Sequence, residues 1–360
     1  MVPGGGAAWR KKVRRHGPVV LLVLGLLLLL TLAALGYVVY YELHVRLRRH
    51  HAPQIVVVHA PPPLASNDRV TPAEAAHALD HVSSSSEAQA ISSIVLVTRF
   101  FGSDADYSRF LKFLQRVQHM VNDIVILVNH QQDRSGASKA LKAEFGHAMS
   151  GVHVLDLMDW EGVTGPLNAS IKYIESTIWP TPKHVLFASP EVEFLSKDLR
   201  ALYNAMDGGT LVAGALMPGH ANPTTLTRSS SSEADAQIGE SSLLSRAPLS
   251  GDTSPWNTFA LWDFGKLRRT LFPGIADEQS PPGMEEIGAI AAHFASDPSG
   301  SRAKLLIPTS RNKQVVWNTD QLDGDRLTNH KEKIRSKNAR AKNILAAMNS
   351  SGVSVDFVYI

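Results

Sequence analysis

Short apolar runs typical of buried strands alternate with helix-forming segments along the middle of this chain, and this alternation restricts the possible folds more than any other feature. Ile94-Val95-Leu96-Val97-Thr98 predicts a strand, and residues 103–118 carry apolar side chains at helical spacing. Further strands are expected at 123–129, 152–157, 183–188 and 210–216, and further helices at 138–145, 167–177 and 197–206, the last capped by Ser196. This alternation predicts an α/β fold: a mostly parallel sheet covered by helices on both faces.

The strand expected at residues 183–188 ends at an acidic turn. Ser189-Pro190 stops the strand, because proline cannot continue a central strand, and Glu191 and Glu193 follow directly. Ligands of open α/β sheets bind at the carboxyl ends of the strands, where a carboxylate can hold a divalent cation against a phosphate. The same residues also fit a plain buried strand followed by a solvated acidic turn.

The alternation is interrupted at residues 221–254, whose serine-rich composition predicts a long exposed loop or lid. Ordered structure is expected to resume at 255–263. Glu285 and Glu286 then precede a helix at 287–294, where acidic residues also suit the helix dipole. A late strand at 304–307, a basic helix at 331–348 and a final strand complete the chain.

The N-terminal part carries an apolar run from Pro18 to Tyr41 that is long enough to cross a bilayer of roughly 30 Å as a helix. It is too long for a secretory signal peptide, although Ala33-Ala34-Leu35-Gly36 loosely resembles a cleavage site. Basic residues are more numerous before the run than after it, which predicts a cytoplasmic tail at 1–17, a signal-anchor at 18–41 and a stem at 42–90. Asn168 and Asn349 would then be candidate glycosylation sites.

Composition excludes several classes of function. The chain has 360 residues and no cysteine, so disulfides, thiolate metal sites and cysteine nucleophiles are excluded. A net charge of +3 is too small to indicate a nucleic-acid partner. No glycine-rich phosphate loop, Gly-x-Ser-x-Gly elbow or His-Glu-x-x-His motif supports a nucleotide triphosphatase or a hydrolase.

The order of these features over residues 92–310 resembles that of glycosyltransferases with the GT-A fold, in the family-two-like group. Residues 94–99 resemble the first strand of that family, whose end contacts the nucleotide, and Asn168-Ala169-Ser170-Ile171 resembles a helix start that often reads Arg-Asn-x-Gly. Ala188-Ser189-Pro190-Glu191 stands where the family has its Asp-x-Asp metal motif. Two more stretches fall where the family has acceptor contacts and an acidic catalytic pair, namely Pro255-Trp256-Asn257-Thr258 and Gly283-Met284-Glu285-Glu286.

The chain departs from that family at three places. Ser189-Pro190-Glu191 keeps one of the two expected carboxylates, and Leu167 replaces the arginine expected before Asn168. Asp104-Ala105-Asp106 spells the metal motif, but it stands at a helix start after the first strand, where aspartates normally cap the helix. A cap, or a contact to the nucleotide, therefore fits these aspartates better than a metal role.

The resemblance implies a type II membrane protein of the Golgi with a lumenal catalytic domain at 91–315 and a C-terminal helix and strand at 316–360. It would transfer a sugar from a nucleotide-sugar donor to a hydroxyl of a glycan, lipid or protein acceptor, with manganese or magnesium. The residues implied are Glu285 and Glu286 for catalysis; Thr98, Arg99, Asp104, Asn129, Asn168 and Ser189 for the nucleotide sugar; Trp256 and Asn257 for the acceptor; and Glu191 for the metal.

Several assignments stay open at the level of the sequence. Either glutamate of the 285–286 pair can be the general base that an inverting transfer needs. The departing diphosphate needs positive charge, from a metal, from Arg311 or Lys313, or from the basic helix, although the pattern of that helix fits a solvated or docking surface better. Trp256 and Trp262 fit either sugar stacking or core packing. The alternatives to a transferase are an inactive GT-A-like domain tethered as a scaffold and a different nucleotide-binding enzyme.

Overall fold

The computed structural model describes part of the chain, and the account below refers to these residues: 55–56, 93–100, 104–131, 133, 136–145, 151–221, 243–308, 315–319, 322 and 324–360. The expected tail at 1–17, the apolar run at 18–41 and nearly all of the stem lie outside them, as do Arg311 and Lys313. None of the described helices is both long and apolar enough to span a bilayer. The membrane anchor therefore stays a prediction.

One half of the main sheet consists of parallel strands, as expected. The order β4-β3-β2-β5 places β2 (Ile94–Phe100) between β3 (Asp123–Asn129) and β5 (His184–Ala188), with β4 (Val152–Leu157) beyond β3. These strands are buried on both faces, which explains their unbroken apolar runs. A short strand, β1 (Ile55–Val56), pairs antiparallel with β4 at the edge.

The other half of the sheet contains reversals that were not predicted. β9 (Phe259–Asp263) lies antiparallel between β5 and β7 (Thr210–Ala215). β10 (Arg302–Ile307) and β12 (Ser354–Tyr359) then continue in parallel. β8 (Leu243–Pro248) pairs antiparallel with β12 at the far edge, so the prediction of a loop throughout 221–254 is wrong for these six residues. The sheet is mostly parallel, with β12 from the C-terminal segment inside it.

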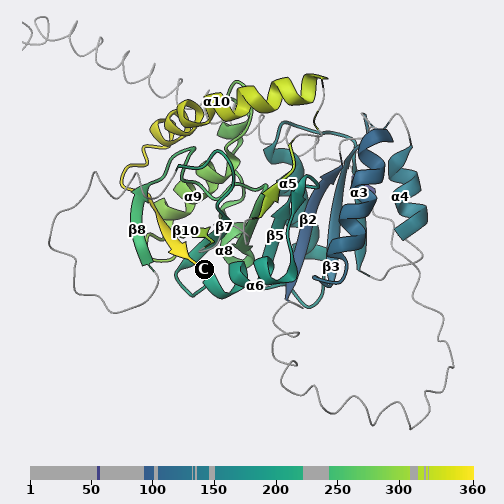
Figure 1. Ribbon diagram of the computed structural model, residues 1–360, viewed down its shortest axis with the longest axis horizontal. Helices are drawn as coiled ribbons and strands as arrows, with labels where there is room; N and C mark the ends of the chain where they lie inside the picture. Colours follow the sequence, from purple (N-terminus) through teal and green to yellow (C-terminus); the bar gives the residue numbers. More distant parts are fainter. Residues whose placement is uncertain are drawn as a thin grey trace, which may run out of the picture. The chain divides into compact units, whose positions relative to one another are not determined.

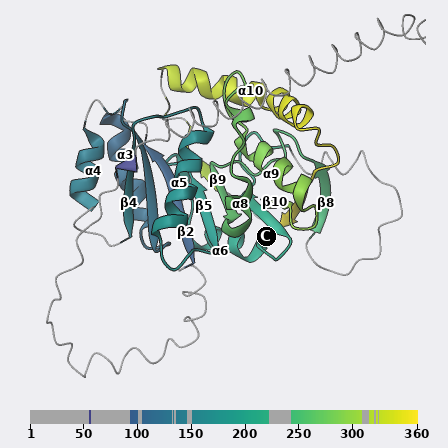
Figure 2. The same cartoon turned by 180° about the vertical axis from the view of Figure 1, so that it is seen from behind.

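Helices cover both faces of this sheet, as predicted (Figures 1 and 2). His184 on β5 packs edge-on against Tyr203 of α6, whereas Phe187 packs against Phe272, which follows α8. Residues three apart on a strand point to opposite faces, so α6 and α8 lie on different faces. In chain order, the helices are α3 (Asp104–Val117), α4 (Ala137–Phe145), α5 (Thr164–Thr177), α6 (Ser196–Ala205), α8 (Phe264–Thr270), the short 3-10 helix η3 (Gly274–Ala276) and α9 (Glu285–Ser296).

Two helix starts differ from the prediction for identifiable reasons. α5 begins three residues before the expected Leu167, because the Asp277 carboxylate accepts hydrogen bonds from Val163 N at 2.5 Å and from the backbone and hydroxyl of Thr164. At α6 the cap is not Ser196. Instead Leu195 N donates to Asp198 Oδ2 at 2.7 Å, and Ser196 is the first helical residue.

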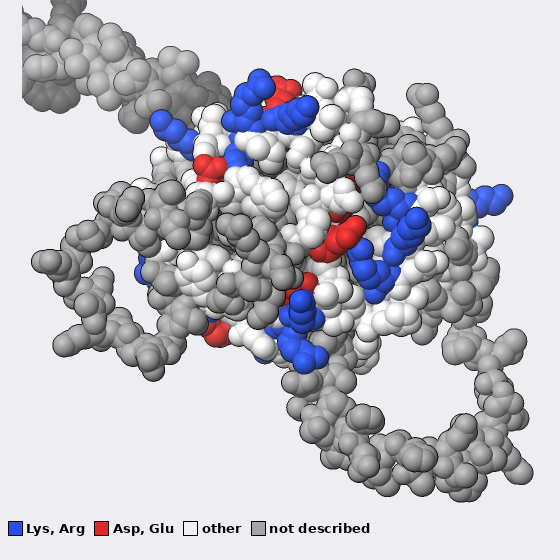
Figure 3. Space-filling view, in the orientation of Figure 1, with Lys and Arg blue, Asp and Glu red and all other residues white. Residues whose placement is uncertain are grey.

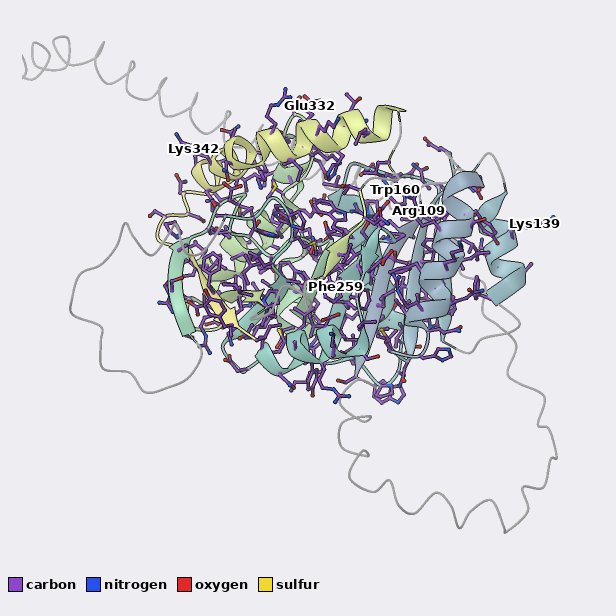
Figure 4. All side chains as sticks on the ribbon, in the orientation of Figure 1. Arg109, Lys139, Trp160, Phe259, Glu332 and Lys342 are labelled. Atoms are coloured by element: carbon purple, nitrogen blue, oxygen red, sulfur yellow. The ribbon has the colours of Figure 1, made fainter. Side chains whose placement is uncertain are left out.

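The long helix α10 (Gly324–Ala347) lies across the upper edge of the sheet in Figures 1 and 2 and packs on α9. It starts well before the expected residue 331. A small second sheet forms where β6 (Val192–Glu193) pairs with β11 (Val316–Trp317). Phe259, at the start of β9, lies in the interior of the molecule (Figure 4), is fully buried and packs against Phe194, which follows β6. Together, α10 and the small sheet enclose the carboxyl end of β5.

Candidate functional site

A cavity of about 380 Å³ opens at the carboxyl edge of the sheet. It lies between the ends of β2 and β5, the start of α9 and the inner side of α10. Seven of the residues predicted to form the site line it: Arg99, Ser189, Glu191, Trp256, Asn257, Glu285 and Glu286. The fold therefore brings together side chains that are up to 187 positions apart in the sequence, counted from 99 to 286.

The acidic turn after β5 is held in place at one side of the cavity. Glu191 is only 8% exposed, its Oε2 accepts a hydrogen bond from Ser189 Oγ, and its carbonyl oxygen accepts one from Asn318 N at 2.9 Å. The Asn318 contact continues the β6–β11 pairing, so the small sheet fixes this turn. Glu193, the second carboxylate of the turn, is exposed on β6.

A chain of hydrogen bonds orients Glu285 at the start of α9. Trp262 Nε1 donates to Asn257 Oδ1 at 2.9 Å, which fixes the orientation of the amide. Asn257 Nδ2 then donates to Glu285 Oε1 at 3.3 Å. Glu285 is 7% exposed and Trp262 is fully buried in the core, so the core itself positions this carboxylate. The possibility that Trp262 stacks on a sugar is thereby excluded.

Glu286 has a different environment from its neighbour. It is 3% exposed, and Ser254 Oγ donates to its Oε1 at 3.4 Å. Burial raises the pKa of Glu286 well above its ordinary value, and the adjacent negative charge of Glu285 raises it further. The pair therefore favours a state in which Glu286 holds a proton and Glu285 is the carboxylate able to accept one.

Aromatic rings form one wall of the cavity. His220 stacks on Trp256 with ring centroids 3.8 Å apart, and Trp317 meets Trp256 edge-on at 5.6 Å. Trp256 is only 7% exposed and its Nε1 donates to Gly251 O at 3.0 Å, so it forms part of the wall and not an open stacking platform. Trp317 is half-buried, lines the cavity and contacts His330 at 4.8 Å, and nothing in its own sequence context predicted that position.

The inner side of α10 adds positive charge to the cavity. Lys333, Lys337 and Arg340 line it together with His330, and the four recur at spacings of three and four residues. Burial lowers the pKa of His330 below its ordinary value, so the positive charge comes from the lysines and the arginine. The sequence analysis named this basic helix as one possible source of positive charge, but the same spacing also suits a solvated face. Lys and Arg side chains also gather along the upper edge of the molecule in Figure 3, where α10 lies.

The remaining predicted residues lie outside this cavity. Thr98 lines a smaller adjoining cavity of about 50 Å³, and its buried Oγ1 has no hydrogen-bond partner among the described residues. Asn129 is buried at the end of β3 and accepts from Gln131 N. Asn168 exchanges two hydrogen bonds with the backbone of Phe272, a structural clip between α5 and the segment after α8. Asp104 begins α3, but its side chain lies outside the described set.

The donor set at the β5 turn does not fit a metal ion held by protein side chains. Within the described ranges, no three histidine, aspartate or glutamate side chains group in a way that could hold one. Glu191 supplies one carboxylate, whereas a hard divalent cation takes about six oxygen ligands. The side chains that share the cavity with Glu191 include Arg99 and Lys333, whose positive charges repel a cation.

Comparison with known proteins finds no matching family model and no matching curated protein. A mannosyltransferase from Pyrobaculum calidifontis, solved with GDP-Man and Mn2+, is 11% identical over 72% of this chain and 76% of its own, with a TM-score of 0.42. Glucosyl-3-phosphoglycerate synthase from Mycobacterium tuberculosis, solved with Mn2+, UDP-glucose and phosphoglyceric acid, is 14% identical over 74% and 82%, also with a TM-score of 0.42.

A third similar structure is 4-diphosphocytidyl-2C-methyl-D-erythritol synthase from Anaerococcus prevotii, 10% identical over 71% of this chain and 99% of its own, with a TM-score of 0.36. Similarity at this level establishes neither a family nor an activity. What is established is a mixed α/β protein whose mostly parallel sheet carries a polar cavity at its carboxyl edge.

Proposed function

We propose that this protein is a glycosyltransferase of the GT-A fold, which moves a sugar from a nucleotide-sugar donor to an acceptor hydroxyl. One observation carries the proposal: a buried carboxylate, Glu285, is oriented by Asn257 in the same cavity as the cations Arg99 and Lys333. Transfer from a nucleoside diphosphate needs both a base for the incoming hydroxyl and positive charge for the departing phosphate.

Glu285 is the general base in this proposal. Its carboxylate accepts the proton of the acceptor hydroxyl while the hydroxyl oxygen bonds to the anomeric carbon of the sugar. The bond between that carbon and the β-phosphate oxygen breaks, its electron pair leaves with the nucleoside diphosphate, and a single displacement of this kind inverts the anomeric configuration. Asn257 holds the carboxylate toward the cavity, and the protonated Glu286 keeps a second negative charge away from it.

The other lining residues have supporting roles. Arg99 and Ser189, at the ends of β2 and β5, are placed to contact the nucleotide sugar, in line with ligand binding at the carboxyl edge of such sheets. Trp317 presents a half-buried ring to the cavity and is the better candidate for contact with the acceptor sugar or chain than Trp256.

The location of the protein is a separate proposal. The apolar run at 18–41 and the basic residues before it support a type II anchor with the catalytic domain in the Golgi lumen. Full-length protein carrying a C-terminal epitope tests this orientation. The epitope is expected to resist protease in sealed Golgi vesicles and to be degraded after detergent is added, and digestion in intact vesicles contradicts the orientation.

Activity is tested with the full chain in detergent micelles, offered a panel of UDP-, GDP- and CMP-sugars, with release of the free nucleotide as the readout. Glu285→Gln is expected to lower kcat by roughly 10²- to 10⁴-fold and to leave donor affinity unchanged, because it removes a base without removing a donor contact. Glu278→Gln, at an exposed glutamate nearby in the chain, is the matched control.

The alternative is an inactive domain that acts as a membrane-tethered scaffold. The observation that favours it is the single carboxylate, Glu191, where the resembled family has two. In the same assay a scaffold releases no nucleotide, and thermal shift detects no stabilisation by any nucleotide diphosphate. That combined result would reject the transferase.

A further inference from the structure

One side of α10 carries the cations that line the cavity, an arrangement suited to an anion. Lys333 and Arg340 both line the cavity and stand about two helical turns apart, whereas Glu332, Arg335 and Lys342 do not line it. Arg340 is buried, and Lys333 lines the cavity with a side chain that is also exposed to solvent. Figure 4 shows Glu332 and Lys342 on the outer side of this helix. A basic helix that formed only a solvated surface would not need to bury a cation such as Arg340 beside the cavity.

Arg340 carries the strongest indication of a missing partner. It is 4% exposed, its Nε donates to Ser336 Oγ at 3.1 Å and its Nη2 donates to Lys333 O at 2.6 Å. Its Nη1 is buried without a hydrogen-bond partner among the described residues. A buried donor left unsatisfied costs about 1–3 kcal/mol, so an acceptor supplied by a ligand would recover that energy.

The backbone beside Arg340 makes room for this group. Gly283 has φ +143°, which side-chain-bearing residues rarely adopt, and a Cβ atom there would lie 2.5 Å from Arg340 Nη1. The chain thus keeps a glycine where the guanidinium approaches the cavity wall. The neighbouring cation Lys337 has a different role, because it is already paired with Asp252 at 2.7 Å and lies over the Trp256 ring.

Lys333 faces another cation across the cavity. Lys333 is exposed to solvent at one side, but the atoms packed around it partly desolvate it and lower its pKa; the positive charge of Arg99 lowers this pKa further, while Glu285 acts in the opposite direction. Two like charges that destabilise each other in a cavity are relieved by an anion bound between them. The cations Lys333 and Arg99, which repel a metal ion, are therefore well suited to bind phosphate oxygens.

We propose that Lys333 and Arg340 of α10, together with Arg99 of β2, bind the diphosphate of the nucleotide donor and stabilise it as it departs, without a divalent cation held by the protein. This inference rests on the proposed function and specifies how its leaving group is stabilised. When the anomeric carbon–oxygen bond breaks, the negative charge that develops on the β-phosphate is compensated by these cations.

Calorimetric titration of the full chain in detergent micelles tests the proposal, with UDP, GDP and inorganic pyrophosphate as probes. Each titration is run once with EDTA and once with Mn2+. At least one probe is expected to bind in EDTA, with an affinity that falls as the salt concentration rises. Lys333→Gln is expected to weaken that binding by about 10- to 100-fold, which corresponds to the loss of a charged hydrogen bond.

Arg335→Gln is the control: Arg335 is an exposed cation on the same helix that does not line the cavity, so this variant is expected to leave the affinity unchanged. Lys333 lies at a helical position that glutamine tolerates well, so the variant keeps its fold. Equal losses in Lys333→Gln and Arg335→Gln overturn the proposal, because they indicate only general charge attraction. Binding that needs Mn2+ and disappears in EDTA also overturns it while the transferase stands. No binding in either condition rejects the transferase itself.

Discussion

The buried carboxyl group of Glu286 makes the stability of this fold depend on pH in the direction opposite to that of most acidic residues. Its pKa is raised from 4.5 to about 8, first by burial and then by the charge of Glu285. The unfolded chain releases the Glu286 proton near pH 4.5, whereas the folded chain retains it to higher pH. Between those two values the folded state binds more protons, so raising the pH favours unfolding.

The expected change in the free energy of unfolding follows from the shift in the pKa of Glu286. At about 1.4 kcal/mol per unit, the shift corresponds to an upper limit of about 5 kcal/mol, and relaxation of the coupled pair reduces it. We therefore expect the free energy of unfolding of the wild-type protein, relative to Glu286→Gln, to fall by about 2 to 4 kcal/mol between about pH 5 and pH 8. Glutamine keeps an acceptor for Ser254 and never ionises.

Urea unfolding at a series of pH values measures this difference, with the midpoint and the slope fitted at each pH. The exposed residue Glu278 supplies the control, because Glu278→Gln is expected to leave the pH dependence of the wild-type protein unchanged. Curves for wild type and Glu286→Gln that stay parallel from pH 5 to pH 8 would falsify the claim that Glu286 is protonated in the folded protein.

Three further predictions concern other residues. Asn257→Asp places a second carboxylate about 3.3 Å from Glu285, and the like charge disfavours the ionised form of Glu285. The acid limb of the pH profile of kcat/KM is therefore expected to move to higher pH by about one unit or more. An acid limb that does not move argues against Glu285 as the base. Asp277→Ala removes the bonds that start α5 and is expected to cost about 2–3 kcal/mol in urea unfolding, against about 1 kcal/mol for Asp198→Ala, and equal costs contradict this. If the domain is lumenal, the exposed Asn349 carries a glycan, and Asn349→Gln abolishes the mass loss on endoglycosidase treatment.

The strands of the parallel half could be predicted closely from the sequence. β3 and β4 have the predicted bounds. β3 carries an unbroken apolar run, as a strand buried on both faces requires, and β4 is marked by its valines and leucines although it also contains His153 and Asp156. β8 was missed because an edge strand lacks that signal. It contains Arg246, which pairs with Asp356 at 2.7 Å, and Pro248, and both suit the edge of a sheet.

Partners that are distant in the sequence explain the other errors. The start of α5 depends on Asp277, which lies 113 residues after Thr164, so no local pattern marks it. Likewise, β9 runs antiparallel between two parallel strands because of pairings with β5 and β7 that the segment itself does not encode. Local propensity sets which segments become strands, and tertiary contacts set their direction.

The candidate site could be predicted in part. Glu191 was singled out because it follows a strand, a position that a sheet of this class brings to its ligand-binding edge, whereas Asn257 and Glu285 were taken from the resemblance to a family; the structure places all three at one cavity. The cations of α10 were left between a solvated surface and a site. Their spacing suits both, and it is the packing of α10 on α9 that buries Arg340 and brings Lys333 to the cavity.

The hydrogen bond from Trp262 to Asn257 also limits which substitutions this protein can accept at position 262. A fully buried tryptophan usually tolerates replacement by another large apolar residue as long as the volume of the core is kept. Here the indole N–H sets the orientation of the amide that holds Glu285, so phenylalanine would preserve the packing but leave the carboxylate proposed as the general base without its orientation. A library that randomises the core and is selected only for folding should accept phenylalanine at position 262, whereas selection for turnover should remove it.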